Sequence, residues 1–223
     1  MKRSTTLSSL ALASALALTG CGTTGAEESP GTAAETAAPA ASAPETTSTS
    51  SASGEPVAEE HNDDDVMFAQ MMIPHHEQAV DMSETLLAKD DLPVEVADFA
   101  QRVVDAQGPE IERMDQMLTT WGQERLADAE DMDGMDHGSG AGMSGMMSEE
   151  DLSALADAQG TEAARLYLGQ MTVHHEGAVE MARDQVEQGQ NPQAVALAQD
   201  VIEAQEAEIT EMEELLQGLP SGS

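Results

Sequence analysis

The amino-acid sequence predicts an all-α protein, a four-helix bundle made of two repeated helical hairpins. Residues 67–82 read MFAQMMIPHHEQAVDM and residues 166–181 read LYLGQMTVHHEGAVEM, so one stretch with a His-His dyad is written twice. A second related stretch follows each copy, AQRVVDAQGPEIERMDQML at 100–118 and AQDVIEAQEAEITEMEELL at 198–216. Apolar residues recur in all four stretches at steps of three and four, as on one face of a helix. A pair of helices used twice accounts for these observations.

The first 21 residues have the pattern of a bacterial lipoprotein signal peptide. Residues 1–3 (MKR) form a basic start, and the apolar run at 7–18 is too short for a membrane span. Residues 18–21 (LTGC) resemble a lipobox, in which the cysteine receives lipid and becomes the first residue after cleavage. We therefore expect lipidation at Cys21 and a lipid-anchored location on the extracytoplasmic face of the cell membrane. An ordinary secretory signal with a stray cysteine is the alternative.

Composition and charge narrow the classes of partner. The chain has 223 residues, and 43 acidic against 8 basic side chains give a formal net charge of −35. So few basic groups cannot neutralise a phosphate backbone, which excludes non-specific binding to nucleic acid. The single cysteine excludes an intramolecular disulfide. Residues 22–61 are mainly Ala, Thr, Ser, Pro, Gly and Glu, and they are predicted to form a disordered tether because they bury too little apolar surface to fold.

The folded part is predicted to cover residues 62–220, as two repeats joined by a loop. N-cap candidates at 62–65, and acidic residues after Ser148, mark where the first helix of each repeat begins. Turns that end at Pro93 and Pro192 separate the two helices of each repeat. The expected segments are repeat one at 62–121 with helices at 66–89 and 94–121, a Met-rich loop at 127–147, and repeat two at 148–218 with helices at 149–187 and 193–217.

Prolines and glycines mark the positions where these helices are expected to bend or break. Pro74 lies inside the first helix, removes one backbone hydrogen bond and is expected to kink it. Val173 occupies the same position in the second copy, so the dyad does not require a kink. The Gly-Pro pair at 108–109 either bends or interrupts the second helix. The third helix is either continuous or broken near Gly160.

Each helix is expected to turn one apolar stripe inward, interrupted by a single polar residue. In the first helix of each repeat that residue is a histidine, and in the second helix it is a glutamine. An imidazole or amide that faces a helical core needs a polar partner or a metal ion. The predicted stripes are Phe68, Met72, His75, Ala79, Met82, Leu86; Tyr167, Met171, His174, Ala178, Met181; Ala100, Val104, Gln107, Ile111, Met114, Leu118; and Ala198, Ile202, Gln205, Ile209, Met212, Leu216.

Methionine three residues before histidine is the pattern that points to copper. Met72 and His75 share a helix face, as do their equivalents in the second copy. Di-iron bundles present Glu-x-x-His instead, so methionine here exchanges a hard ligand for a soft one that favours Cu(I), while imidazole serves both copper oxidation states. The second histidine of each dyad lies about 100° further round the helix, facing a neighbouring site, an acidic partner or a helix contact. The candidate ligands are His75, His76, His174, His175, Met72, Met82, Met171, Met181, Met114 and Met212.

The loop between the repeats is a second candidate copper site. Its glycine, serine and aspartate residues cannot form a core, so its methionines have no packing role there. Soft thioethers around an imidazole suit Cu(I). The alternatives are a flexible linker and an oxidant sink in which methionine cycles through its sulfoxide. The candidate residues are Met132, Met135, His137, Met143, Met146 and Met147.

The sequence also resembles a known bacterial family. The segment MMIPHHEQAVDM at 71–82 is similar to the signature of the domain-of-unknown-function family numbered 305, and the resemblance covers about residues 63–216. The second copy departs from that signature at Thr172 and Val173, which leaves its dyad intact. Characterised members of the family are extracytoplasmic, CopM-like copper-binding proteins with a ferritin-like four-helix bundle. The resemblance therefore implies a ferritin-like bundle with copper at the matching His and Met positions, and Gln107 and Gln205 on the partner helices.

The expected function is copper tolerance, buffering or delivery through His and Met ligands for Cu(I), Cu(II) or both. No phosphate loop, nucleophile elbow or His-Glu-x-x-His zinc motif is present, so no enzymatic activity is expected. The alternatives are a structural or partner-binding bundle without metal, and a metal-oxidising enzyme. Expected partners are the membrane, through the lipid anchor, and a copper donor or acceptor protein.

Overall fold

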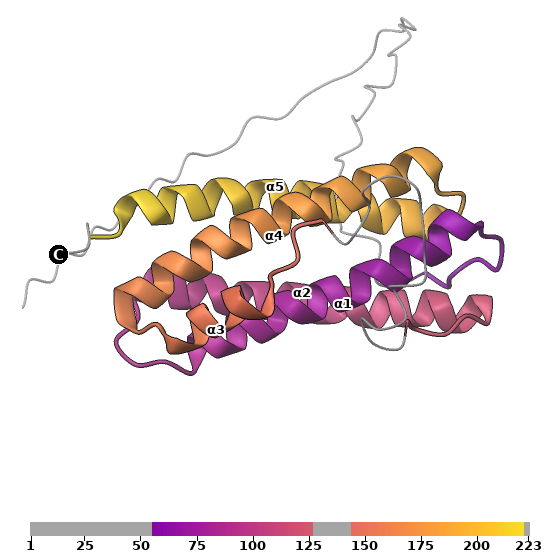
Figure 1. Cartoon of the computed structure of the whole chain (residues 1–223). Helices are drawn as coiled ribbons and strands as arrows, with labels where there is room; N and C mark the ends of the chain where they lie inside the picture. The colour runs from indigo at the N-terminus through magenta and orange to yellow at the C-terminus, as the bar shows by residue number, and fades with distance from the viewer. Residues whose placement is uncertain (1–54, 127–143, 221–223) are drawn as a thin grey trace, which may run out of the picture. The chain divides into compact units, whose positions relative to one another are not determined.

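A computed structural model describes residues 55–126 and 144–220, which contain five α-helices and no strand. The all-α prediction is therefore confirmed for this part of the chain (Figure 1). The expected signal peptide with Cys21, most of the tether and loop residues 127–143 lie outside the described residues. The helices are α1 (Asp63–Leu87), α2 (Val94–Trp121), α3 (Glu149–Asp157), α4 (Gly160–Gln188) and α5 (Pro192–Gly218).

Two hairpins, α1 with α2 and α4 with α5, carry the most extensive helix contacts. Short connections between the helices of each pair make them antiparallel neighbours, as Figure 1 shows. The hairpins meet mainly through α1 and α4, the two helices that carry the His dyads. The short helix α3 packs against α4 and α1. Among the helices described, none is long and apolar enough to cross a membrane.

The break near Gly160 that the sequence left open is present, so the helix expected at 149–187 is divided into α3 and α4. Ala158 and Gln159 have extended backbones, with ψ near 156° and 154°. Gly160 then adopts φ +53°, a left-handed conformation that costs a residue with a Cβ atom more than it costs glycine. By contrast, α2 runs through Pro109 without interruption, so the Gly-Pro pair does not end that helix.

The helix starts follow the capping signals of the sequence. Asn62 caps α1 in a capping box with Asp65, and Ser148 caps α3 in the same way with Asp151. The first helix therefore begins three residues before the expected position. Asp65 is fully buried, and its carboxylate also accepts hydrogen bonds from the Gln185 side chain and from the backbone amide of Asn191. These hydrogen bonds connect the start of α1 to the end of α4 and to the segment between α4 and α5.

The inward stripes of the dyad helices agree with the structure, whereas those of α2 and α5 are shifted. All six residues predicted for α1 are buried, and in α4 Met181 alone is only partly buried. In α2 and α5 the valines at 103 and 201 are buried instead of the residues that follow them. The apolar face of such a helix is more than 100° wide, so buried residues lie on both sides of the predicted stripe and one line of residues does not describe the whole face. The predicted positions that are only partly buried are Val104, Ile111, Ile202, Ile209 and Leu216.

The buried apolar residues form two separate clusters. Cluster one includes α1 up to Ile73 and α4 from Ala178 onward. Cluster two includes α4 up to Met171 and α1 from Ala79 onward. Both His dyads therefore fall between the clusters, and so do the glutamines of α2 and α5. We call the residues in this gap the polar layer: His75, His76, Gln107, Glu110, His174, His175, Gln205 and Glu208.

Candidate metal centre

The first histidine of each dyad meets its equivalent from the other repeat inside the polar layer. His75 and His174 are 0% and 1% exposed, and their ring centroids lie 3.8 Å apart with an interplanar angle of 40°. Equivalent residues of two repeats can touch only near the axis that relates the repeats. Both rings face inward, as the predicted stripes indicate, and the structure adds that they meet at the junction of the two hairpins.

The free nitrogens of this pair are well defined. His75 Nε2 lies 3.1 Å from the backbone oxygen of Ser144, which only accepts, so Nε2 carries the proton and Nδ1 keeps a lone pair. Neither ring nitrogen of His174, nor Nδ1 of His75, has a hydrogen-bond partner among the described residues. Nδ1 of His75 and whichever nitrogen of His174 carries the lone pair are therefore available as metal donors.

Burial holds both imidazoles in the neutral form that a metal ligand requires. It lowers the pKa of His75 to about 3, with the nearby His76 and His175 acting in the same direction. Burial also lowers the pKa of His174 well below its ordinary value, helped by the other three imidazoles. The charged form loses its hydration in the core and meets like charges there. At neutral pH the pair therefore offers lone pairs, not protons.

The second histidine of each dyad pairs with a carboxylate of its own hairpin. His76 Nε2 lies 2.8 Å from Glu110 Oε2, and His175 Nε2 lies 2.6 Å from Glu208 Oε2. Both imidazoles are fully buried, while the carboxylates are about one-fifth exposed. Of the three roles left open for these histidines, the structure has the acidic partner.

Sequence reasoning missed Glu110 and Glu208 as site residues, although a signal for them exists. The helices α2 and α5 both read Gln-x-x-Glu across the polar layer, starting at Gln107 and Gln205. Each glutamate is therefore three residues after a glutamine already singled out, and the two occupy equivalent positions of the repeat. The Gln107 amide itself has no hydrogen-bond partner at either atom among the described residues, and Gln205 has none at its oxygen.

The candidate methionines lie on both sides of the polar layer, and each side contains methionines from both hairpins. Met72 and Met114 of the first hairpin lie in cluster one, and Met181 of the second hairpin packs against it. Their equivalents Met171 and Met212 lie in cluster two together with Met82 of the first hairpin. Of the candidate methionines, each cluster thus combines two from one hairpin with one from the other. The predicted set does not gather at one point but forms one group on either side of the imidazoles.

The end of the interhairpin loop, Ser144 to Met147, lies across the layer, and we call it the strap. The Ser144 carbonyl accepts the hydrogen bond from His75, and the Ser144 hydroxyl donates one to Glu180. The backbone amide and carbonyl of Met147 both hydrogen-bond to the Gln78 side chain. Met146 and Met147 are only partly buried in this segment. The other loop candidates, Met132, Met135, His137 and Met143, lie outside the described residues, and the loop site stays a prediction.

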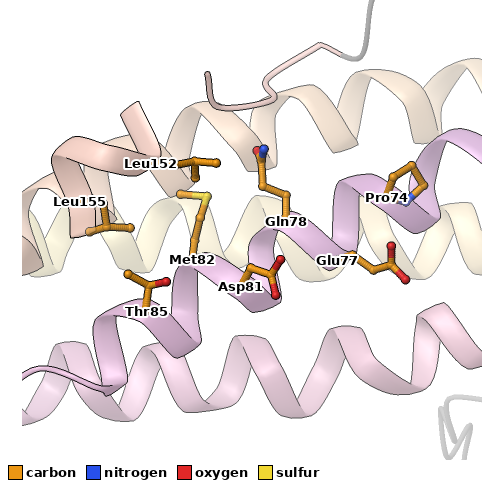
Figure 2. A pocket seen from close by; sticks show the side chains of 8 residues that line it. All are labelled: Pro74, Glu77, Gln78, Asp81, Met82, Thr85, Leu152 and Leu155. Carbon is orange, nitrogen blue, oxygen red and sulfur yellow. The ribbon is translucent and has the colours of Figure 1, made fainter. Parts of the chain in front are cut away.

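A groove of about 310 Å³ runs beside the strap, between α1 and α3. Figure 2 shows its lining, in which Glu77 and Asp81 of α1 contribute carboxylates and Met82 contributes a sulfur atom. Gln78, which holds the strap, lines the same groove. Within the described residues, no group of three or more His, Cys, Asp or Glu side chains is arranged to hold a metal ion. The polar layer and its flanking thioethers are the candidate centre because of their unpartnered imidazole nitrogens and the methionines on either side.

Known proteins share this architecture. Residues 65–216 match the model of a family described as Domain of unknown function (DUF305). A putative secreted DUF305 protein from Streptomyces coelicolor is 33% identical, with a TM-score of 0.63 over 72% of this chain and 97% of that one. A DUF305 fragment from Deinococcus radiodurans is 29% identical, with a TM-score of 0.61 over 71% and 98%. CopM in its Cu(I)-bound form is 31% identical, with a TM-score of 0.55 over 69% and 96%. No curated protein sequence matches the chain.

Proposed function

This chain belongs to the DUF305 family, and on that basis we propose that it is an extracytoplasmic copper-binding protein for copper tolerance, buffering or delivery. The proposed centre is the polar layer, with imidazoles as nitrogen donors and the flanking methionines as sulfur donors. In this proposal the four long helices form the ferritin-like bundle expected from the sequence, with α3 as an additional short helix. The chain is a binding protein, not an enzyme.

The observation that carries the proposal is a set of five buried imidazole nitrogens without a hydrogen-bond partner among the described residues. A buried polar atom left unpaired costs about 1–3 kcal/mol, because it has given up hydrogen bonds to water. Metal coordination would use one lone pair from each ring and remove that cost at four of the five nitrogens, because one nitrogen of the neutral His174 ring carries the proton. The nitrogens are Nδ1 of His75, His76 and His175 and both ring nitrogens of His174.

Donor chemistry favours copper over harder metals. Thioether sulfur is a soft ligand that suits Cu(I), and imidazole binds both Cu(I) and Cu(II). The carboxylates nearest the imidazoles, Glu110 and Glu208, are engaged by His76 and His175. The similar protein CopM has been crystallised with Cu(I), with Cu(II) and with silver, a soft ion that resembles Cu(I). These relatives support a site that accepts soft monovalent ions.

The proposed location rests on the sequence. The lipobox-like residues 18–21 support export and lipid attachment at Cys21, which would place the centre outside the cytoplasm. A formal net charge of −35 raises the local concentration of cations around the protein. An acidic, anchored copper protein is suited to intercept metal near the membrane and pass it to a donor or acceptor protein.

Metal titration of the full-length chain tests the proposal. Metal-free protein would be titrated with Cu(I) under anaerobic conditions against a competing chelator, and with Cu(II) in air, while the thermal midpoint is followed. Saturable binding with a raised midpoint is expected, because copper would bind only the native state. A structural bundle would show neither effect. A metal-oxidising enzyme would consume oxygen over many turnovers of added Cu(I), which a binding protein does not.

A further inference from the structure

The two His–Glu pairs of the polar layer have an organisation that simple packing does not require. Both pairs use Nε2 of a fully buried imidazole and one carboxylate oxygen of a helix in the same hairpin. Both glutamates occupy equivalent positions of the repeat. In both pairs the opposite nitrogen, Nδ1, is buried and has no partner among the described residues.

The carboxylates determine which nitrogen carries the proton. An ionised carboxylate only accepts hydrogen bonds, so Nε2 of His76 and of His175 must be the protonated nitrogen. In the neutral imidazole this leaves a lone pair at Nδ1. The hydrogen bond to the carboxylate therefore leaves the buried Nδ1 as the nitrogen that is free to bind a metal ion.

We propose that Glu110 and Glu208 are positioning residues that hold His76 and His175 in the Nε2–H tautomer and present Nδ1 to the metal. This inference rests on the proposed copper function and identifies the ligating atom of each ring. Histidine ligands of metals commonly donate their second N–H to a carboxylate, which fixes the tautomer and ring orientation. The carboxylates lie at the partly exposed rim of the layer, opposite the buried Nδ1 atoms.

His75 follows the same rule with a different acceptor. Its Nε2 donates to the Ser144 carbonyl of the strap, which again leaves Nδ1 as the free nitrogen. In three of the four imidazoles Nε2 donates a hydrogen bond, to a carboxylate in two rings and to a backbone carbonyl in the third. In each of these three rings Nδ1 is the nitrogen left to bind the metal. His174, with neither nitrogen engaged among the described residues, has no such constraint.

The first test needs no variant. Long-range ¹H–¹⁵N correlation spectra of the metal-free full-length chain at neutral pH distinguish the two neutral tautomers and the imidazolium form. We expect His76 and His175 to show protonated Nε2 and unprotonated Nδ1. A doubly protonated ring, or a proton on Nδ1, at both residues would overturn the proposal.

The second test uses Glu110→Gln and Glu208→Gln. A glutamine side chain is of similar size but can donate as well as accept, so it no longer dictates the tautomer. We expect mixed tautomers in the metal-free variants and a loss of Cu(I) affinity of about 10- to 100-fold, as for other residues that orient metal ligands. Thermal melting of the metal-free variants checks that they remain folded.

Matched controls separate positioning from the general loss of negative charge. Glu112→Gln on α2 and Glu211→Gln on α5 each remove one charge close to Glu110 and Glu208 in sequence, and Glu211 pairs with Arg102 instead of a histidine. These controls should keep the wild-type tautomers and change Cu(I) affinity by less than about twofold, because exposed charges are screened. Equal losses in controls and test variants would overturn the proposal.

The outcomes also distinguish this inference from the function on which it rests. If wild-type protein binds no copper, the proposed function fails, and the positioning role fails with it. If wild-type protein binds copper but Glu110→Gln and Glu208→Gln bind it equally well, the function stands and the positioning role alone is contradicted.

Discussion

His75 illustrates how a single buried imidazole is prepared as a ligand. Its ring contacts that of His174 at 3.8 Å between centroids, its Nε2 donates to a backbone carbonyl, and its Nδ1 has no partner among the described residues. A histidine that served only to fill space would satisfy both nitrogens or be replaced by an apolar residue. The unsatisfied nitrogen is therefore the residue-scale evidence for a ligand, and it can be tested by substitution.

Replacing His75 by Gln or Met72 by Leu should remove copper-dependent stabilisation while preserving the fold. Both substitutions roughly conserve volume, and such changes usually cost less than about 1.5 kcal/mol. Wild-type protein at free copper a hundredfold above its Kd gains about 2.7 kcal/mol, because only the native state binds. Thermal melting with and without Cu(I) measures that gain, and His174→Gln and Met171→Leu provide the matched pair. An undiminished copper-induced shift in all four variants would show that these four side chains pack the bundle and do not bind the copper.

Stability of the metal-free protein should fall in acid partly because of the histidine pair. The pKa of His75 is about 3 in the folded state against 6.5 for an unperturbed imidazole, so the unfolded chain binds protons first. The contribution is present above pH 6.5 and is lost progressively as pH falls toward about 3.

The test compares wild type with His75→Gln by urea unfolding at pH 7 and pH 5. Both proteins keep His76 and His175, the imidazoles that lower the pKa of His75, so the difference reports on His75 together with its effect on the pKa of His174. Wild type should lose more stability than the variant between these two pH values. Equal losses would contradict a buried neutral imidazole.

At the scale of elements, the strap makes the two repeats different. Equivalent positions of the repeat hold Gln78 in α1 and Gly177 in α4. Gln78 binds the backbone of Met147, while the absent side chain of Gly177 leaves room for the Ser144 carbonyl. A Cβ atom at Gly177 would lie 1.9 Å from that oxygen. The difference between Gln78 and Gly177 thus lets one strap lie across the polar layer, whose two halves are otherwise related by the repeat.

Gly177→Ala should therefore destabilise the protein although alanine is the better helix former. The added Cβ would displace the strap and break its hydrogen bond to His75, and such overpacking typically costs about 1–3 kcal/mol. Gly169→Ala in the same helix is the control, since its Cβ meets nothing within 4 Å. That control should gain up to about 1 kcal/mol. Urea unfolding measures both changes, and a stabilising Gly177→Ala would show that the strap does not need this contact.

At the scale of the whole molecule, the chain combines an expected membrane anchor with an acidic domain. Residues 55–126 and 144–220 contain only helices, none able to cross a membrane. The single cysteine, Cys21, lies outside them, at the position of the lipobox-like sequence. The proposed anchor and the proposed metal centre thus lie in different parts of the chain and can be tested separately.

Cys21→Ala should release the protein from membranes without changing the helical domain. Lipidation requires the cysteine thiol, and no helix of the described residues would replace the anchor. Fractionation of cells that produce each protein, followed by circular dichroism of the purified chains, measures both properties. Membrane partitioning equal to that of wild type would contradict the lipoprotein prediction.

The sequence by itself determined where the helices lie in the chain and, for the two helices that carry the dyads, which residues face inward. Spacing of three and four put Met72, His75 and Met82 on one buried face, and capping residues such as Ser148 marked where helices start, because these signals act within a few turns of one helix. The sequence left open a break near Gly160, and the structure has it there, where the glycine adopts a left-handed backbone.

Only the tertiary structure decided which atoms face one another. Glu110 became the partner of His76, the methionines divided into two clusters, and Ser144 became the acceptor for His75, although 69 positions separate these last two residues. Such contacts depend on the rotation and depth of one helix against another and on the path of a loop. Those quantities are set by packing among all the helices, so no local pattern in the sequence contains them.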